Sequence, residues 1–245
     1  MTTRTVLVTG AASGIGEAVA QRAAQDGHRV IVADRDGEGA ERVAADIGGE
    51  AWVVDLSETE ALDDLQLECD VLVNNAGIQR VAPIQEFVPE DFRLIQRLML
   101  ESPFLLIRAA LPHMYAQGWG RIVNISSAHG LRASEFKSAY VAAKHGLEGL
   151  SKVAALEGAP HGVTSNCLNP GYVRTPLIEA QIADQARTHG IPEAEVMAKI
   201  MLTRSPVKRL IEPAEVAALA AFLMSDDAGM ATGASYTMDG GWTAQ

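Results

Sequence analysis

The chain has 245 residues, of which 48% are hydrophobic and 21% are charged. This composition excludes a mainly disordered chain, and the length suits one α/β domain of ordinary size. Lys and Arg total 20 against 31 Asp and Glu, so the formal net charge is −11. That sign opposes binding to nucleic acid or to an anionic membrane surface, and we expect neither as a partner.

Cysteine usage and hydropathy both point to the cytoplasm. Cys69 and Cys167 are too few for a disulfide framework or a zinc motif, which favours a reducing compartment. The longest apolar run, Val216 to Met224, is much shorter than the ~20 residues that a bilayer span needs. The first residues enter a strand-like run without a signal-peptide pattern, so we expect a cytoplasmic protein.

Short apolar runs alternate with amphipathic segments along the whole chain. Strands are predicted at residues 6–8, 29–33, 51–54, 71–73, 121–125, 163–168 and 235–238. Helices are predicted at residues 15–25, 39–47, 58–67, 91–115, 138–156, 175–202 and 213–224, the sixth being broken at 190–192. This alternation predicts an α/β fold: one doubly wound, Rossmann-like parallel sheet of about seven strands with helices on both faces.

Two further expectations concern the organisation of the chain. We expect a single dinucleotide-binding and catalytic domain over residues 1–245. Pro103 lies within a long helical pattern and is predicted to kink it. Residues 176–206 lie outside the strand–helix alternation and follow the carboxyl end of a strand, where ligands bind in such sheets, so they are predicted to form a mobile substrate lid.

A glycine-rich stretch, Thr9–Gly16 (TGAASGIG), follows the first predicted strand and opens the first predicted helix. Glycines allow a tight turn and a close approach of the backbone to a pyrophosphate. The partial positive charge at a helix N-terminus stabilises the negative charge of that pyrophosphate. The predicted phosphate-binding residues are Gly10, Ser13, Gly14, Ile15 and Gly16. A glycine cluster alone is a weak signal, and a plain strand-to-helix turn is the alternative.

Acidic residues follow the next two strands. Asp34 ends the second strand, where a carboxylate can accept hydrogen bonds from both ribose hydroxyls and would repel a 2′-phosphate. This predicts NAD rather than NADP, although the neighbouring Arg35 suits a phosphate. Asp55 follows the third strand and either faces the adenine or caps a helix together with Ser57.

Tyr140 and Lys144 are spaced four residues apart on a predicted helix and therefore share one face. A phenol titrates near ~10 and is a poor base at neutral pH, but an ammonium group one turn away stabilises the phenolate. Ser127 lies just past a predicted strand, where its hydroxyl can hold the reacting oxygen. These residue types predict general-base chemistry on an alcohol.

Together these motifs resemble the short-chain dehydrogenase/reductase family over essentially the whole chain. The matching pieces are Thr9–Gly16, Asn74–Gly77 (NNAG), Ser127, Tyr140–Lys144 (YVAAK), Pro170–Gly171 and Asp239–Gly241 (DGG). The resemblance implies hydride transfer between a secondary alcohol and NAD(P), with Tyr140 as the general base, Lys144 orienting the ribose, and Ser127 positioning the substrate. It also implies a cofactor site that includes Leu56, Asn74, Asn75, Ala76, Gly77, Tyr140, Lys144, Pro170, Gly171, Val173 and Thr175.

The chain departs from the family pattern at two places. Many members carry an Asn in the long helix after NNAG that anchors a proton-relay water, whereas the matching residue here is Met99. The connection between Asp55 and Asn74 is also short, which indicates a trimmed third helix.

Within the family, the resemblance is greatest to members that oxidise D-3-hydroxybutyrate. It is carried by Asn74–Gln79, Ser127–Leu131, Lys137–Lys144, Pro170–Leu177 and Asp239–Thr243. In those enzymes a small carboxylate is bound by residues that match Gln79, His129, Lys137 and Gln181. In such a set the Lys supplies a point charge, and the two Gln and the His supply directed hydrogen-bond donors. Taken one at a time, each of the four residues has an ordinary alternative as a surface or packing side chain. Tyr172 stands where some relatives have Trp.

The resemblance thus implies NAD-dependent oxidation of D-3-hydroxybutyrate to acetoacetate, with a small hydroxy or keto acid as the partner. The alternatives are another enzyme of the family, such as an NADPH-dependent 3-oxoacyl-thioester reductase, or a non-catalytic NAD-binding regulator. No metal is predicted, because the His residues lack ligand spacing. By analogy with the family we expect a homotetramer that packs through the two long helices at 91–115 and 138–156.

Overall fold

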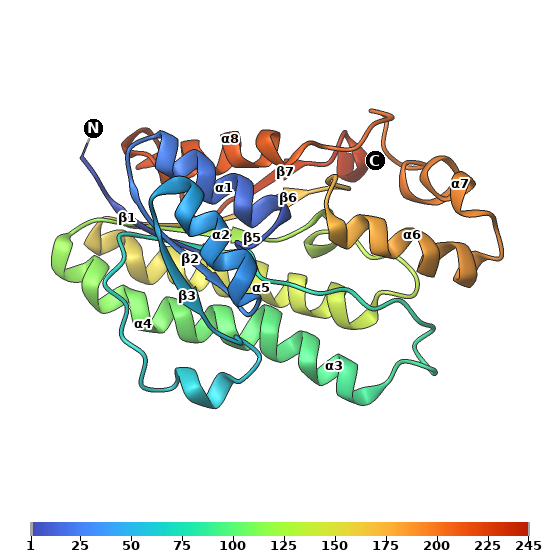
Figure 1. Cartoon of the computed structure of the whole chain (residues 1–245), viewed down its shortest axis with the longest axis horizontal. Coiled ribbons are helices and arrows are strands. Elements are labelled where there is room, and N and C mark those ends of the chain that lie inside the picture. The colour runs from blue at the N-terminus through green and yellow to red at the C-terminus, as the bar shows by residue number, and fades with distance from the viewer. Residues whose placement is uncertain (1, 245) are drawn as a thin grey trace.

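The computed structural model describes residues 2–244 and contains one parallel sheet of seven strands (Figure 1). The strand order is β3-β2-β1-β4-β5-β6-β7, which confirms the predicted doubly wound fold. The strands are β1 (Thr5–Thr9), β2 (Arg29–Asp34), β3 (Glu50–Val53), β4 (Val71–Asn74), β5 (Gly120–Ile125), β6 (Val163–Pro170) and β7 (Ser235–Met238). Every residue of β4, β5 and β6 is buried, as parallel strands covered on both faces require.

Helices cover both faces of the sheet (Figure 1). They are α1 (Gly14–Gln25), α2 (Gly37–Ile47), α3 (Pro89–Gln96), α4 (Ser102–Gln117), α5 (Ser138–Gly158), α6 (Pro176–His189), α7 (Glu193–Val196) and α8 (Pro213–Met224). An apolar core joins α1, α2 and α8 to one face, and a second core joins α4 and α5 to the other. The first and last helices thus pack side by side although they are far apart in sequence.

The prediction of a helix at residues 58–67 is wrong. The structure has only a 3₁₀ turn at Thr59–Leu62, followed by an irregular segment. Beyond the short i→i+3 bonds of this turn, the segment bonds to α4: Leu67 N–H donates to the carbonyl of Ala109 at 3.1 Å, and the Arg108 side chain donates to the carbonyl of Asp63. The short connection therefore crosses the face of the sheet without the length for a helix.

The long helix predicted at residues 91–115 is interrupted by a π turn at Arg97–Glu101, between α3 and α4. Proline lacks an N–H, and its ring clashes with the carbonyl four residues earlier, which for Pro103 belongs to Met99. The wider i→i+5 turn, in which Ser102 N–H donates to the Arg97 carbonyl, relieves that conflict. The proline effect was thus predicted, but it takes the form of a π turn just before Pro103.

The segment α6–α7 projects beyond the carboxyl ends of the strands (Figure 1). It has a small apolar cluster of its own that includes Ile178, Val196 and Met201, and α6 ends at Gly190 in the left-handed conformation, with φ +65°. The predicted break at 190–192 is therefore present. A semi-independent unit at this edge has the position that the predicted lid requires.

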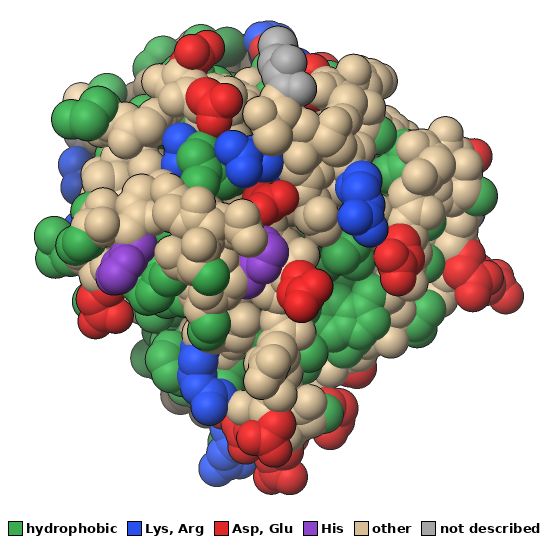
Figure 2. Space-filling model, turned by 90° about the vertical axis from the view of Figure 1, so that its left-hand side faces the viewer, with side chains coloured by type: hydrophobic (Ala, Val, Ile, Leu, Met, Phe, Trp, Pro, Cys, Tyr) green, Lys and Arg blue, Asp and Glu red, His purple; other side chains and the backbone are tan. Residues whose placement is uncertain are grey.

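The surface carries the expected mixture of charges. On the face opposite α6 and α7, acidic, basic and apolar side chains are interspersed (Figure 2). Within residues 2–244, none of the helices combines the length and the apolar character that crossing a membrane would demand.

Candidate active site

One cavity of about 360 Å³ opens at the carboxyl ends of the strands, beneath the start of α6. The structure brings nearly all of the predicted site residues to its wall. These residues are Gly10, Ser13, Gly14, Ile15, Asp34, Asp55, Leu56, Asn75, Ala76, Gly77, Gln79, Ser127, His129, Lys137, Tyr140, Lys144, Pro170, Gly171, Tyr172, Val173, Thr175 and Gln181. Residues from most of the chain length therefore converge on one hollow.

Two predicted cofactor residues, Gly16 and Asn74, do not line the cavity. A Cβ on Gly16 would overlap the carbonyl oxygen of Gly10, so its role is to let α1 pack against the glycine turn. Asn74 is buried beneath the cavity, where its Nδ2 donates to Asn124 Oδ1 at 2.8 Å. Both residues support the site without facing it.

The glycine turn after β1 fits a dinucleotide. Gly10 and Gly14 have φ of +63° and +61°, a conformation that L side chains rarely adopt. A Cβ on Gly10 would also lie 2.8 Å from the Cα of Ala76, and one on Gly14 would lie 3.2 Å from Thr175 Cγ2. The backbone therefore lines this end of the cavity directly, ahead of the N-terminus of α1, as pyrophosphate binding requires.

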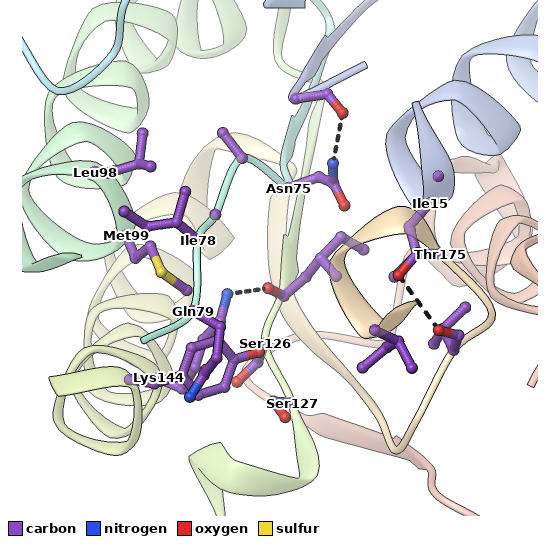
Figure 3. Close-up of a pocket in the computed structure, with 18 of the residues that line it drawn as sticks. Ile15, Asn75, Ile78, Gln79, Leu98, Met99, Ser126, Ser127, Lys144 and Thr175 are labelled. Atoms are coloured by element: carbon purple, nitrogen blue, oxygen red, sulfur yellow. Dashed lines mark hydrogen bonds between the residues drawn. The ribbon is translucent and has the colours of Figure 1, made fainter. Parts of the chain in front are cut away.

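Asn75 fixes that turn from the neighbouring strand. Its Nδ2 donates to the carbonyls of Thr9 and Gly10 at 2.9 and 3.1 Å. One bond from this amide is drawn in Figure 3. The Thr9 hydroxyl in turn accepts from the backbone N–H groups of Asn75 and Ala76 at 2.9 and 3.1 Å. These bonds tie the ends of β1 and β4 together at the cavity floor.

The two predicted adenosine-side carboxylates are both held by backbone donors. Asp34 Oδ2 accepts from Ala12 N–H and Oδ1 from Asp36 N–H, each at 3.0 Å. Asp55 Oδ1 accepts from the N–H and the hydroxyl of Ser57 at 2.9 and 2.7 Å, and these bonds lower the pKa of Asp55. Asp55 thus stabilises a local turn with Ser57 while also lining the cavity.

The catalytic triad predicted from the sequence is assembled around the end of β5. Ser127 follows that strand, and Tyr140 and Lys144 share one face of α5. The Lys144 Nζ donates to the Ile125 carbonyl at 2.6 Å (Figure 3) and lies 5.7 Å from the centroid of the Tyr140 ring. Burial lowers the pKa of Lys144 to about 8, so the amine is about half charged or more at neutral to mildly alkaline pH.

The acidity of Tyr140 differs from the sequence expectation. Burial raises the pKa of the Tyr140 phenol in the protein alone, and the hydrogen bond with Ser127 opposes that rise. In the protein alone, the nearby Lys144 ammonium thus does not offset the effect of burial on the Tyr140 phenol. The positive charge of an oxidised nicotinamide would favour the phenolate further.

Met99 occupies the place of the relay Asn within the π turn. Its side chain is buried and lies beside Ile78 and Leu98 (Figure 3). A Cβ on Gly77 would lie 3.1 Å from the Met99 Cε, so the thioether fills the space next to the NNAG loop. A thioether is a weak acceptor and cannot donate, so this side chain cannot anchor a relay water as an amide would.

The four predicted anion-binding side chains are buried at one end of the cavity. The exposed fractions of Gln79, His129, Lys137 and Gln181 are 6%, 5%, 4% and 6%. For Lys137 the reading as a surface residue is therefore excluded. Its Nζ donates to the Tyr172 hydroxyl at 3.4 Å and lies 5.2 Å from the centroid of that ring.

Charge and polarity at this end suit a small anion. Burial lowers the pKa of Lys137 to about 8, which leaves it mainly protonated at neutral pH, and lowers the pKa of His129 to about 3, which leaves that ring neutral. The His129 Nδ1 lies 3.4 Å from the Ser127 Oγ, and the His129 Nε2 lies 3.0 Å from the Ser134 Oγ. Within residues 2–244, the buried Oε1 of Gln181 finds no hydrogen-bond partner. That oxygen accepts hydrogen bonds and so calls for a donor, whereas the Nε2 of the same amide is the atom that can donate to an anion.

Sequence reasoning missed Trp242 as a cavity residue. Its ring centroid lies 4.9 Å from that of His129, and it closes the anion end of the cavity. Asp239 positions it, because the carboxylate accepts from Gly241 N–H at 2.8 Å and from the N–H and hydroxyl of Thr243 at 2.8 and 2.6 Å. The signal was present in Asp239–Thr243 (DGGWT), which combines a tight turn with one large aromatic.

Comparisons with known proteins find relatives over nearly the full length of the chain. A family model described as enoyl-(acyl carrier protein) reductase matches residues 10–243. The chain is 45% identical to the D-beta-hydroxybutyrate dehydrogenase of Rhizobium meliloti (strain 1021), over 99% of this chain and 100% of that protein. A 4-hydroxyisoleucine dehydrogenase structure with NADH has a TM-score of 0.87 at 29% identity, covering 99% of this chain and 100% of that one. A structure described as a putative 2-deoxy-D-gluconate 3-dehydrogenase from Agrobacterium tumefaciens, with bound NADP, has a TM-score of 0.85 at 35% identity. The match covers 99% of this chain and 97% of that one.

The chain belongs to the short-chain dehydrogenase/reductase family. It is an NAD(P)-dependent oxidoreductase. Its relatives act on different substrates and hold different dinucleotides, so the particular reaction must be argued from the cavity.

Proposed function

We propose that the protein oxidises D-3-hydroxybutyrate to acetoacetate with NAD, and catalyses the reverse reaction. The observation that carries the proposal is the burial of one cation, Lys137, among Gln79, His129 and Gln181 beside Ser127 and Tyr140. Burying an ammonium group is costly unless an anion or several polar partners compensate. The similarity to the Rhizobium meliloti enzyme supports a short hydroxy acid as that anion.

In this proposal one end of the cavity binds the dinucleotide, the other end binds the substrate carboxylate, and the reacting hydroxyl lies between them. The glycine turn and Asp34 hold the dinucleotide, which supplies a hydride acceptor when bound. Lys137, Gln79 and Gln181 hold the substrate carboxylate. The hydroxyl at C3 then lies between Ser127 and Tyr140, and the cavity walls align it with the bound dinucleotide.

The protein's own part in the oxidation is proton transfer. Ser127 donates a hydrogen bond to the reacting oxygen, and the Tyr140 phenolate takes the hydroxyl proton as the hydride leaves C3, so the C3–O bond becomes a carbonyl. Lys144 holds positive charge near that phenolate. In the reduction the Tyr140 phenol returns the proton to the carbonyl oxygen.

Replacing Asp34 with Ser tests the dinucleotide preference. Asp34 presents a carboxylate, fixed by Ala12 and Asp36, to the adenosine end of the cavity, and this charge repels a 2′-phosphate. We expect the KM for NAD to rise about tenfold and the use of NADP to increase, which corresponds to about 1.4 kcal/mol of lost NAD binding. Initial rates with both dinucleotides measure the ratio, and an unchanged ratio contradicts the assignment.

The most direct test of the reaction itself is NADH formation with the separate enantiomers of 3-hydroxybutyrate. We expect turnover of the D form, little turnover of the L form, and slower turnover of a neutral secondary alcohol of the same size. Lack of turnover with both enantiomers would remove the proposed substrate.

The two rival functions predict other results. A 3-oxoacyl-thioester reductase is supported by the 36% identity with the acetoacetyl-CoA reductase of Cupriavidus necator, and it would prefer NADPH and a thioester without a free carboxylate. Such a substrate leaves the buried Lys137 uncompensated, which argues against it. A non-catalytic NAD-binding regulator would show no turnover, and the assembled Ser127, Tyr140 and Lys144 argue against that role.

The remaining expectations extend the proposal. Closure of α6–α7 over the cavity would bring Gln181 onto the carboxylate. A homotetramer through the long helices is supported by apolar side chains exposed on α3, α4 and α5: Phe92, Phe104, Val153 and Leu156. We propose no nucleic acid, membrane or metal partner.

A further inference from the structure

Glu148 is a buried carboxylate behind the active site that takes no direct part in the chemistry derived above. It lies on α5, one turn beyond Lys144, is 5% exposed and does not line the cavity. One carboxylate oxygen accepts from the Asn169 Nδ2 at 2.5 Å, and the other accepts from the Ser235 hydroxyl at 2.6 Å. A charge this well buried and bonded is expected to have a specific role.

The first connection runs from Glu148 to the loop that carries Ser127. The same Asn169 Nδ2 that donates to Glu148 also donates to the Ser127 carbonyl at 2.9 Å. The carboxylate also lies directly against the turn after Ser127, because a Cβ on Gly130 would be 2.9 Å from Glu148 Oε1. Glu148 thus supports the backbone of the catalytic serine from below.

The second connection is electrostatic. Residues spaced four apart on a helix have Cβ atoms about 5–6 Å apart, so the carboxylate lies close to the Lys144 stem. Burial lowers the pKa of Lys144, and the charge of Glu148 acts in the opposite direction and raises it. Lys144 needs its positive charge to stabilise the Tyr140 phenolate.

The Cys167 side chain on β6 also acts to raise the pKa of Lys144. Burial and Glu148 raise the pKa of the Cys167 thiol itself, so that thiol is protonated and uncharged at neutral pH. Tyr140 shares the helix of Lys144, and Ile95 and Met99 of the apolar cluster beside Ala139 and Ala143 carry no charge. Ile125 contributes only a carbonyl dipole. Glu148 is therefore the group that supplies a negative charge here.

We propose that Glu148 is a positioning residue for hydride transfer: its charge keeps Lys144 in the ammonium form, and its bond through Asn169 fixes the loop that carries Ser127. The proposal rests on the oxidoreductase chemistry of the family, and only its turnover assay uses the substrate assigned above. Glu148 acts through other residues and touches neither substrate nor dinucleotide.

Replacing Glu148 with Gln tests the charge. The amide keeps the shape and the acceptor for Asn169 but removes the negative charge. Because the pKa of Lys144 then falls from about 8, activity on the alkaline side is lost at lower pH. We expect the alkaline limb of the kcat profile to move down by about one pH unit and kcat at pH 8 to fall about fivefold. The matched control is Glu157→Gln, an exposed carboxylate on the same helix, whose profile should follow the unmodified protein.

Replacing Asn169 with Ala tests the tether separately. This change removes the bonds of Asn169 to the Ser127 carbonyl and to Glu148, but Glu148 keeps its negative charge and its bond to Ser235. We therefore expect kcat to fall with the alkaline limb unmoved. Thermal unfolding of all three variants identifies any that fails to fold, and the folded variants decide. A Glu148→Gln profile that superimposes on that of the unmodified protein overturns the proposal, as does an Asn169→Ala variant with full kcat.

A readout without substrate separates this proposal from the assigned reaction. The pH dependence of NADH binding, followed by nucleotide fluorescence, also reports the charge of Lys144, which borders the dinucleotide in the cavity. We expect the Glu148→Gln midpoint to lie about one pH unit lower. If the Glu148→Gln midpoint shifts but the unmodified protein does not turn over hydroxybutyrate, the assigned substrate is wrong and the role of Glu148 stands. If the midpoint does not shift and hydroxybutyrate is turned over fully, the role of Glu148 is wrong and the assigned substrate stands.

Discussion

Replacing Tyr140 with Phe is expected to reduce kcat for 3-hydroxybutyrate oxidation by about 1,000-fold or more, since positioned proton transfer contributes factors of about 10²–10⁴. In the proposed reaction the phenol takes the hydroxyl proton, and it lines the cavity together with Ser127 and Lys144. Phe keeps the ring and therefore the shape of the cavity wall. Steady-state rates of NADH formation measure the loss.

The same variant should still bind the dinucleotide. The glycine turn, Asp34 and Asn75 are unchanged, so the dissociation constant for NADH, measured by fluorescence, is expected to stay within about threefold, below the ~1.4 kcal/mol that a tenfold change represents. Substantial turnover by a folded Tyr140→Phe protein would refute the assignment of the general base.

Replacing Lys137 with Ala is expected to lower kcat/KM for 3-hydroxybutyrate by about 100-fold, mostly through KM. Truncating one partner of a buried charge pair costs about 2–5 kcal/mol, and 100-fold corresponds to the lower part of that range. The reason is that the Lys137 ammonium is the one cation within the predicted carboxylate-binding set. Initial rates over a range of acid concentrations measure the effect.

A neutral secondary alcohol and an exposed lysine provide the controls. The alcohol has no carboxylate, so Lys137→Ala should change its kcat/KM only slightly. Lys152→Ala removes an exposed lysine on α5 and should change neither substrate. An equal loss with the acid and the alcohol would place Lys137 outside the carboxylate site.

The pH dependence follows from the same residue. Burial lowers the pKa of Lys137 to about 8, so the ammonium is present below that pH and is lost as pH rises through it. Anion binding should therefore weaken above pH 8. Because Lys144 titrates in the same range, we expect the ratio of kcat/KM for the acid to that for the neutral alcohol to fall above pH 8, and to become flat in Lys137→Ala. A ratio that stays flat in the unmodified protein contradicts this role.

Prediction from the sequence succeeded where the physical cause is local. Run length and composition placed all seven strands, because short Val, Ile and Leu runs bounded by turn residues are typical of strands buried in a covered parallel sheet. Spacing along one helix placed Tyr140 and Lys144 on a common face. The prediction at 58–67 failed because its backbone bonds to α4, a partner distant in sequence.

Local patterns in the chain were enough to place the seven strands, the glycine turn, and Tyr140 and Lys144 on one helix face, because each depends on residues near one another in the sequence. Three features emerged only from the folded molecule. Lys137 is a buried cation and not a surface residue. Asn74 lies beneath the cavity whereas Asn75 lines it. Glu148 lies behind Lys144 and the loop that carries Ser127. Burial and charge compensation are properties of the packed molecule: they arise when β6, β7 and α5 come together, and no single segment encodes them.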